Sequence, residues 1–167
     1  MPTGDAPHKR IDPEPGPGVR LELARLAAGD DGLFEVSDLE LRRDGPSYTY
    51  LTLEALREAD PEADLCFLMG ADVAADIERW ERPRRVLELA RIAVAARPGT
   101  PVDEVRAALE RLGTADRLDL VRMPEIDASS TAVRQRVAAG EPIVDLVPEA
   151  VAEAISDRGL YRQAVRA

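Results

Sequence analysis

The stretch that decides the fold is Leu65-Cys-Phe-Leu-Met-Gly70, followed further along the chain by Arg91-Ile-Ala-Val-Ala-Ala96. Both are short, almost uninterrupted apolar runs, and such runs are typical of strands buried on both faces of a parallel sheet. Gly70 ends the first run and Pro98-Gly99 follows the second, as expected where a strand gives way to a loop. The two runs therefore predict neighbouring strands of a mainly parallel sheet.

The segments around these runs alternate between helix and strand patterns. Strands are expected at 65–69, 91–96 and 118–123, and helices at 19–28, 50–59, 72–78, 84–90, 102–112, 130–139 and 147–158. A mixed pattern at 33–41 favours one more strand, and Ser47 or Thr49 is expected to cap helix 50–59. Because the alternation shows no repeat and no linker, we expect α/β class and a single domain over 1–167.

Composition excludes several classes of protein. The 167 residues are 45% hydrophobic and 32% charged, which is enough apolar material for a core. No apolar run approaches the ~20 residues of a membrane-spanning helix, and Met1–Arg10 has no apolar signal segment. The single cysteine, Cys66, favours a cytoplasmic protein without disulfides. The net charge of −10 gives no general attraction for nucleic acid or an anionic membrane.

The most specific candidate site is Asp127-Ala-Ser-Ser-Thr-Ala-Val-Arg134, which follows an expected strand and opens an expected helix. Ligands of open parallel sheets bind beyond the carboxyl ends of the strands. Free N–H groups at a helix N-terminus favour an anion, and Ser129, Ser130 and Thr131 add hydroxyl donors. Arg134 lies one turn further on, where it could reach the same phosphates. Taken alone, however, the octamer favours an ordinary serine cap with a solvated arginine.

Three further clusters could contact a nucleotide. Gly70 lets a ligand approach the backbone and Asp72 could accept a ribose hydroxyl, with a helix-capping Asp72 as the alternative. Trp80, the only tryptophan, stands among charged residues, which favours a partly exposed ring over a core residue. Pro7-His8-Lys9-Arg10 groups three potential phosphate contacts, although a solvated basic tail is the plainer interpretation. With His8 as the only histidine, no metal site and no Ser-His-Asp arrangement is expected.

Eight segments in a fixed order carry a resemblance that covers nearly the whole chain. They are Pro2-Thr-Gly-Asp-Ala-Pro-His-Lys9, Gly45-Pro-Ser-Tyr-Thr49, Phe67-Leu-Met-Gly-Ala-Asp72, Trp80-Glu-Arg-Pro83, Ala96-Arg-Pro-Gly99, Ser129-Ser-Thr-Ala-Val-Arg134, Leu146-Val-Pro-Glu-Ala-Val151 and Arg158-Gly-Leu-Tyr161. In this order the chain resembles the bacterial nicotinate-nucleotide adenylyltransferases of the nucleotidyltransferase superfamily. The resemblance implies a Rossmann-like fold. It also implies transfer of AMP from ATP to nicotinate mononucleotide, which gives deamido-NAD and pyrophosphate in NAD biosynthesis, with Mg²⁺.

The resemblance also implies roles for the candidate residues on the ATP side. Arg134 and Lys9 would be catalytic and would act on the phosphates. The remaining nucleotide-binding set would be His8, Gly70, Asp72, Ser129, Ser130 and Thr131. The reaction needs no covalent intermediate, so catalysis would consist of in-line positioning and charge stabilisation of the leaving pyrophosphate.

On the pyridine side, the resemblance implies that Trp80 stacks on the ring and that Arg97 contacts the same substrate. The backbone N–H groups of Tyr48 and Thr49 would bind the pyridine carboxylate. A carboxylate is stabilised at a helix N-terminus, and a carboxamide gains less, so this arrangement would favour nicotinate over nicotinamide.

One departure from the family concerns its opening. The family begins with a strand, a Gly-x-Phe-Asp-Pro-x-His-x-Gly-His loop and a helix, and no such run occurs in this sequence. We expect a sheet without its first β-α unit, exposed apolar residues along 65–69 and 92–96, and little activity without the two histidines. Met1 would then be an internal methionine, or the chain a nucleotide-binding remnant. A pantetheine-phosphate adenylyltransferase is a further alternative, and a homo-oligomer stays open.

Overall fold

The computed structural model describes residues 1–4, 15–30, 32–96, 102–123 and 128–162. The chain forms two compact units. Unit 1 combines Met1–Ser47 with Ile126–Ala167, and unit 2 is Tyr48–Glu125. The single domain expected over 1–167 stays a prediction.

Unit 2 is built on a three-stranded parallel sheet, as the apolar runs predicted. Its strands are β1 (Cys66–Gly70), β2 (Arg91–Ala96) and β3 (Leu118–Arg122), in the order β1-β2-β3. β2 is the central strand and pairs in parallel with both neighbours. The α/β class is therefore confirmed, and the expected strand boundaries agree to within one residue.

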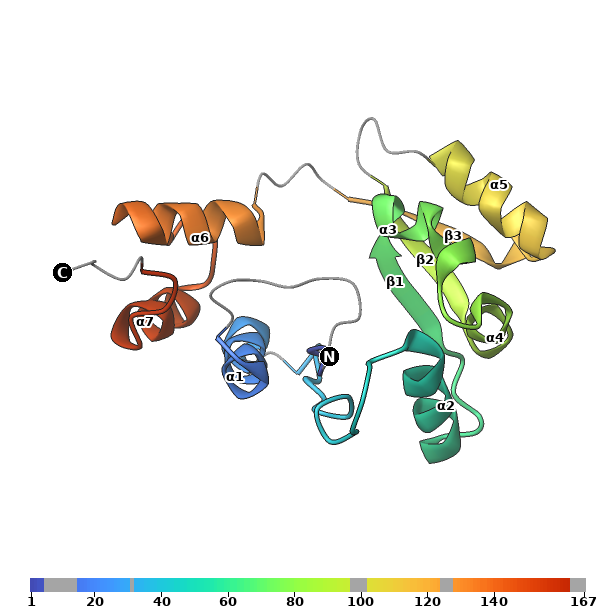
Figure 1. Ribbon diagram of the computed structural model, residues 1–167, viewed down its shortest axis with the longest axis horizontal. Coiled ribbons are helices and arrows are strands. Elements are labelled where there is room, and N and C mark those ends of the chain that lie inside the picture. Colours follow the sequence, from blue (N-terminus) through green and yellow to red (C-terminus); the bar gives the residue numbers. More distant parts are fainter. Residues whose placement is uncertain (5–14, 31, 97–101, 124–127, 163–167) are drawn as a thin grey trace. The chain divides into compact units, whose positions relative to one another are not determined.

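Helices supply the connections that parallel strands require. Those of unit 2 are α2 (Thr49–Ala59), α3 (Ala71–Ala75), η1 (Ile77–Arg79), α4 (Pro83–Leu89), α5 (Val102–Leu112) and η2 (Ala115–Arg117). Figure 1 shows the sheet with α5 beside it, and α4 packs on β2 and on α2. The helix expected at 72–78 is divided into α3 and η1, because the backbone tightens to a three-residue turn after Asp76.

The core of unit 2 lies between the sheet and these helices. Its largest fully buried side chains are Ile77, Leu87, Ile92, Leu109, Val86, Val94 and Val105. The exposed apolar surface expected on two strands is found on β1, where Leu68 is 58% exposed, but not on β2. Ile92 and Val94 are buried because β2 has a strand on each side and helices packed against it.

Two local expectations are wrong. Segment 33–41 is not a strand: the N–H groups of Leu41 and Arg42 donate to the Asp38 carbonyl at 2.9 and 3.2 Å, so its end folds back as a turn. Its alternating pattern favoured a strand, but a strand also needs a hydrogen-bonded neighbour. The expected cap of α2 is also wrong, because Tyr48 occupies the N-cap position without a side-chain bond. The Ser47 hydroxyl instead accepts from the Gly4 N–H at 3.0 Å.

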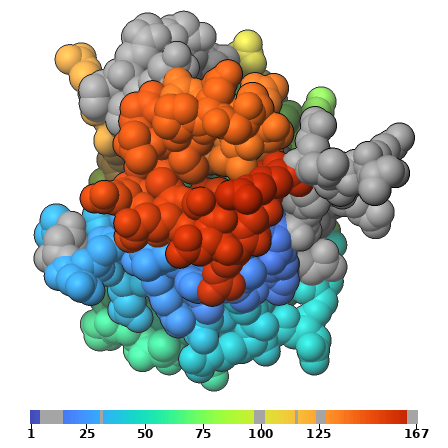
Figure 2. Space-filling model, turned by 90° about the vertical axis from the view of Figure 1, so that its left-hand side faces the viewer, coloured from blue at the N-terminus to red at the C-terminus, as the bar shows by residue number. Residues whose placement is uncertain are grey.

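Unit 1 consists of helices in the residues that the structure describes. They are α1 (Pro17–Ala28), α6 (Ser130–Ala139) and α7 (Glu149–Asp157), which Figures 1 and 2 show packed together. The buried residues of its small core are Val133, Ile143, Val151 and Ile155. Arg158 at the end of α7 donates to Glu22 of α1 at 2.5 Å. Within the described ranges, no helix has the length and apolarity needed to cross a membrane.

Candidate active site

The first turn of α6 forms the candidate phosphate site. Ser129 is the N-cap, and its hydroxyl oxygen accepts from the Ala132 N–H at 3.1 Å. The plainer interpretation thus holds for this side chain, which is a serine cap. Ser130 and Thr131 are the first two residues of the helix and are exposed. Their N–H groups precede the first internal helix bond and remain available to an anion.

Arg134 lies over the same turn. Its guanidinium donates to the Thr131 hydroxyl at 3.3 Å, so the positive charge is held at the N-terminal end of α6. An incoming phosphate could therefore meet backbone N–H groups, hydroxyls and a guanidinium together, and charge-assisted bonds of this kind are the strong ones. The octamer 127–134 predicted this grouping, although Asp127 itself lies outside the described residues.

A cavity of about 430 Å³ adjoins this turn, and we call it the α6 cavity. Ser129, Ser130 and Arg134 line it together with two polar residues that the sequence did not single out, Arg20 and Tyr161. The rest of its lining is mostly apolar and comprises Leu23, Ala128, Val133, Leu146, Val147, Val151 and Ile155. Two guanidinium groups thus line one hollow of a chain whose net charge is −10.

Arg20 and Tyr161 have distinct environments. Arg20 of α1 donates to the carbonyl oxygens of Thr3 and Gly4 at 2.6 and 3.1 Å. Burial raises the pKa of the Tyr161 phenol, and the nearby charges of Arg134 and Arg20 oppose that rise. The one signal in the sequence that Tyr161 could be a site residue was its place in a segment that carried the family resemblance. Arg20 gave none, because it is one of the many arginines in this sequence.

In unit 2, Gly70 and Asp72 meet at the end of β1. A Cβ atom on Gly70 would lie 2.6 Å from the Asp72 Oδ1, so a larger residue at position 70 would displace the Asp72 carboxylate. Asp72 is exposed in the first turn of α3, where its carboxylate is free to meet solvent or a ligand hydroxyl.

The start of α2 holds the two residues expected at the pyridine carboxylate. The Tyr48 carbonyl accepts from the N–H groups of Leu51 and Thr52 at 3.1 and 3.4 Å, which begins the helix. The N–H groups before these belong to the orphan donors of a helix N-terminus. Thr49 is the first helical residue and is half-buried. The start of α2 thus holds backbone donors of the kind that the family resemblance implies, and their binding of the pyridine carboxylate stays a prediction.

Trp80 lies at the end of η1 in the same unit. Its ring meets Phe67 of β1 edge-on, with centroids 6.0 Å apart and planes at 82°. It is half-buried and packs against the core while keeping part of its surface open. The expected partly exposed ring is confirmed, and the indole also packs against the core.

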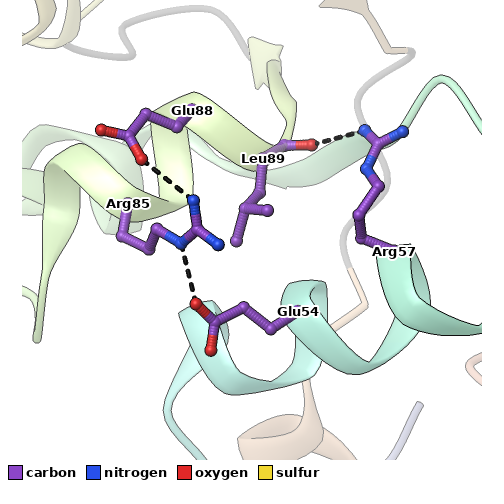
Figure 3. Close-up of polar contacts among 5 residues, drawn as sticks. All are labelled: Glu54, Arg57, Arg85, Glu88 and Leu89. Atoms are coloured by element: carbon purple, nitrogen blue, oxygen red, sulfur yellow. Dashed lines mark hydrogen bonds and ion pairs between the residues drawn. The ribbon is translucent and has the colours of Figure 1, made fainter. Parts of the chain in front are cut away.

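Polar contacts fix α2 against α4 (Figure 3). The Arg85 guanidinium donates to Glu54 at 2.8 Å and to Glu88 at 3.1 Å, and these carboxylates raise the pKa of Arg85. Arg57 donates to the carbonyl oxygen of Leu89, the last residue of α4, at 3.0 Å. These bonds hold α2 in place relative to the segment that carries Trp80.

The structure thus brings the candidate residues together in two groups, one in each unit. Ser129, Ser130, Thr131 and Arg134 form the group in unit 1. Gly70, Asp72, Tyr48, Thr49 and Trp80 belong to unit 2. His8, Lys9 and Arg97 lie outside the described residues. Among the residues that are described, no group of three or more His, Cys, Asp or Glu side chains could hold a metal ion.

Comparison with known protein families identifies the class to which this fold belongs. A cytidylyltransferase-like family model matches residues 1–136. A probable nicotinate-nucleotide adenylyltransferase of Roseiflexus sp. (strain RS-1) is 44% identical over 97% of this chain and 81% of its own length. Another, of Clostridium tetani (strain Massachusetts / E88), is 34% identical over 97% of this chain and 82% of its own. The chain belongs to the nicotinate-nucleotide adenylyltransferase family.

Solved structures with a similar fold include the nicotinic acid mononucleotide adenylyltransferase of Plasmodium falciparum. Its complex with APC gives a TM-score of 0.56 and its complex with NaAD gives 0.54, both at 20% identity. The matches cover 71% and 69% of this chain but only 60% and 57% of the solved chains. At this identity the likeness establishes the fold, which confirms the Rossmann-like nucleotidyltransferase architecture.

Proposed function

We propose that this chain transfers AMP from ATP to nicotinate mononucleotide, giving deamido-NAD and pyrophosphate, and that 1–167 belong to one adenylyltransferase domain. The observation that carries the proposal is the first turn of α6, where exposed N–H donors, hydroxyls and the Arg134 guanidinium meet. Family membership supports the reaction, because the relatives that align over nearly the whole chain bear this activity in their names.

The reaction joins two phosphates without a covalent enzyme intermediate. A phosphate oxygen of nicotinate mononucleotide attacks the α-phosphorus of ATP, the bond from that phosphorus to the bridging oxygen breaks, and pyrophosphate leaves with the electron pair. Negative charge grows on the departing pyrophosphate. Arg134 and the N–H groups of Ser130 and Thr131 are arranged to stabilise it, and preorganised donors of this kind contribute strongly to catalysis.

The remaining ATP contacts complete this half of the proposal. Asp72 accepts a ribose hydroxyl, and Gly70 leaves room for the sugar beside the backbone. Lys9 and His8 contribute further phosphate contacts, as the family resemblance implies. Mg²⁺ accompanies ATP, the co-substrate, as the family resemblance implies.

For nicotinate mononucleotide, the proposal rests on unit 2. The N–H groups at the start of α2, at Tyr48 and Thr49, receive the pyridine carboxylate, which the positive end of the helix favours. Trp80 offers its open face to the pyridine ring, and Arg97 adds a contact to the same substrate. The cytoplasmic location, the lack of nucleic-acid or membrane partners and a homo-oligomer stay predictions.

The test is a pyrophosphate-release assay with Mg²⁺, ATP and either nicotinate or nicotinamide mononucleotide. Because this sequence contains no Gly-x-Phe-Asp-Pro-x-His-x-Gly-His run, we expect slow release with the nicotinate substrate. Release with the nicotinamide substrate should be at least about tenfold less, because hydrogen bonds to a charged carboxylate are stronger than those to a neutral carboxamide. Calorimetric titration with each substrate measures binding independently of turnover. Absence of binding by both pyridine nucleotides, or equal use of 4′-phosphopantetheine, would contradict the proposal.

A further inference from the structure

Arg82 has a backbone conformation that residues other than glycine rarely adopt. Its φ of 50° and ψ of 57° place it in the left-handed region, directly before Pro83, where helical conformations are further disfavoured. Such strain persists only where the surrounding structure holds it, and it concentrates at functional sites. In this conformation the Arg82 side chain contacts an aromatic ring of α2.

The Arg82 guanidinium lies over the face of the Tyr50 ring, 4.9 Å from its centroid. This is within the roughly 6 Å range of a cation–π interaction. Tyr50 is only 8% exposed, and its ring stacks on Tyr48 with centroids 6.2 Å apart and planes at 18°. These three residues form a continuous layer, the Arg82–Tyr50–Tyr48 stack.

The stack joins the two elements of unit 2 that the proposed function assigns to the pyridine substrate. Arg82 lies two residues after Trp80, and Tyr48 and Tyr50 flank Thr49 at the start of α2. Contacts further along, through Glu54 and Leu89, hold the bodies of α2 and α4 together (Figure 3). The stack adds a described contact at the first turn of α2, two residues after Trp80.

We propose that Arg82 and Tyr50 are positioning residues for nicotinate mononucleotide, an inference that rests on the proposed function. They set the separation between the Trp80 ring and the N–H groups that receive the carboxylate. The stack should therefore affect the affinity for the pyridine nucleotide and leave ATP binding alone.

The experiment measures the dissociation constants of nicotinate mononucleotide and of ATP by calorimetry on the full chain and its variants. Arg82→Gly removes the cation but accepts the left-handed backbone, so the fold is kept. Tyr50→Leu removes the ring, and Tyr50→Phe keeps it. We expect Arg82→Gly and Tyr50→Leu to weaken nicotinate mononucleotide about three- to tenfold, in line with the strength of such contacts. Tyr50→Phe should restore near-normal affinity, and ATP affinity should not change.

Arg84→Ala is the matched control, because it removes a neighbouring arginine that donates to the Leu112 carbonyl at 3.1 Å and lies outside the stack. If the unsubstituted chain does not bind nicotinate mononucleotide, the proposed function fails and this inference fails with it. If that chain binds and Arg82→Gly binds equally well, only the inference fails. A parallel loss for both substrates, or no rescue by Tyr50→Phe, would assign the stack a merely structural role and overturn the proposal.

Discussion

The two units bury their apolar side chains to different extents. Unit 2 has seven large side chains with less than 2% exposure, drawn from the sheet, η1 and the helices α4 and α5. The core of unit 1 is four residues between 3% and 9% exposed, and α1 has no buried residue. A sheet covered by helices excludes water from a central strand, whereas three helices with short apolar faces leave their core partly open. The difference teaches that the residues proposed to bind the pyridine nucleotide belong to the better packed unit.

The α6 cavity lies in unit 1, the less well packed of the two units. It reaches the small core of unit 1, since Val133, Val151 and Ile155 line it together with Arg134. Regions with few buried contacts open at low free-energy cost, and ligand-binding elements are often drawn from them. We therefore expect ATP to stabilise unit 1 on binding, whereas the pyridine nucleotide meets a unit that is already rigid.

The largest expected effect concerns Arg134, which would test whether unit 1 carries the charge stabilisation. Arg134→Ala should lower the rate of pyrophosphate release about 10²–10³-fold, or ~3–4 kcal/mol, because a donor to the developing negative charge is lost. Stability should change little, since the side chain is half-exposed. Arg136→Ala is the control: this arginine of the same helix pairs with Asp145 and should affect the rate little. A similar loss in both variants would contradict the assignment.

A comparison of core substitutions tests the packing difference directly. Leu87→Ala in unit 2 should cost about 3 kcal/mol of unfolding free energy, because a 1%-exposed side chain leaves a cavity. Leu146→Ala in unit 1 should cost about 1 kcal/mol, because the side chain is only half-buried. Urea unfolding of the full chain measures both, with substitution of the 81%-exposed Leu33 by alanine as a near-neutral reference. Equal losses of unfolding free energy for Leu87→Ala and Leu146→Ala would contradict the difference in packing between the two units.

Trp80 tests whether its segment of unit 2 binds the pyridine substrate rather than ATP. Trp80→Ala should raise the KM for nicotinate mononucleotide about tenfold, because base–aromatic stacking contributes ~1–3 kcal/mol, with little change for ATP. Loss of the edge contact to Phe67 should also lower stability modestly. Trp80→Phe keeps a ring and should recover most of the affinity. A loss shared equally by ATP, or plain unfolding, would return Trp80 to a purely structural role.

The smallest effect concerns pH. A hydrogen bond and ion pair with Arg111 lowers the pKa of Glu78 in unit 2 below its ordinary 4.5, and Arg136 likewise lowers that of Asp145 in unit 1. A lowered folded-state pKa stabilises the protein above the ordinary value, and the benefit is lost as pH falls through the folded-state pKa. Glu78→Gln and Asp145→Asn should each flatten the fall in melting temperature between about pH 6 and about pH 3. Unchanged slopes would show that these exposed pairs contribute nothing measurable.

Sequence patterns predicted the helices and parallel strands well because each depends on local periodicity. The runs at 65–69 and 91–96 became β1 and β2, and 102–112 and 130–139 were helices over those residues. The prediction of a strand at 33–41 was wrong because an alternating pattern is also compatible with a turn. A strand would have required a neighbouring strand to pair with it. The prediction of a Ser47 cap on α2 was wrong because the Ser47 hydroxyl accepts a hydrogen bond from the N–H of Gly4, which is remote in sequence.

By itself, the sequence determined the α/β class and the family, and it indicated the candidate phosphate site at a helix terminus, since each depends on contiguous residues whose chemistry is local. Tertiary structure alone decided which side chains join these segments. Arg82 over Tyr50, Tyr161 and Arg20 beside Arg134, and Trp80 edge-on to Phe67 are contacts between segments distant in sequence or set by a strained backbone. The physical reason is that packing and electrostatics act through space. Periodicity reports only which face of an element is apolar, not which residue of another element will meet it.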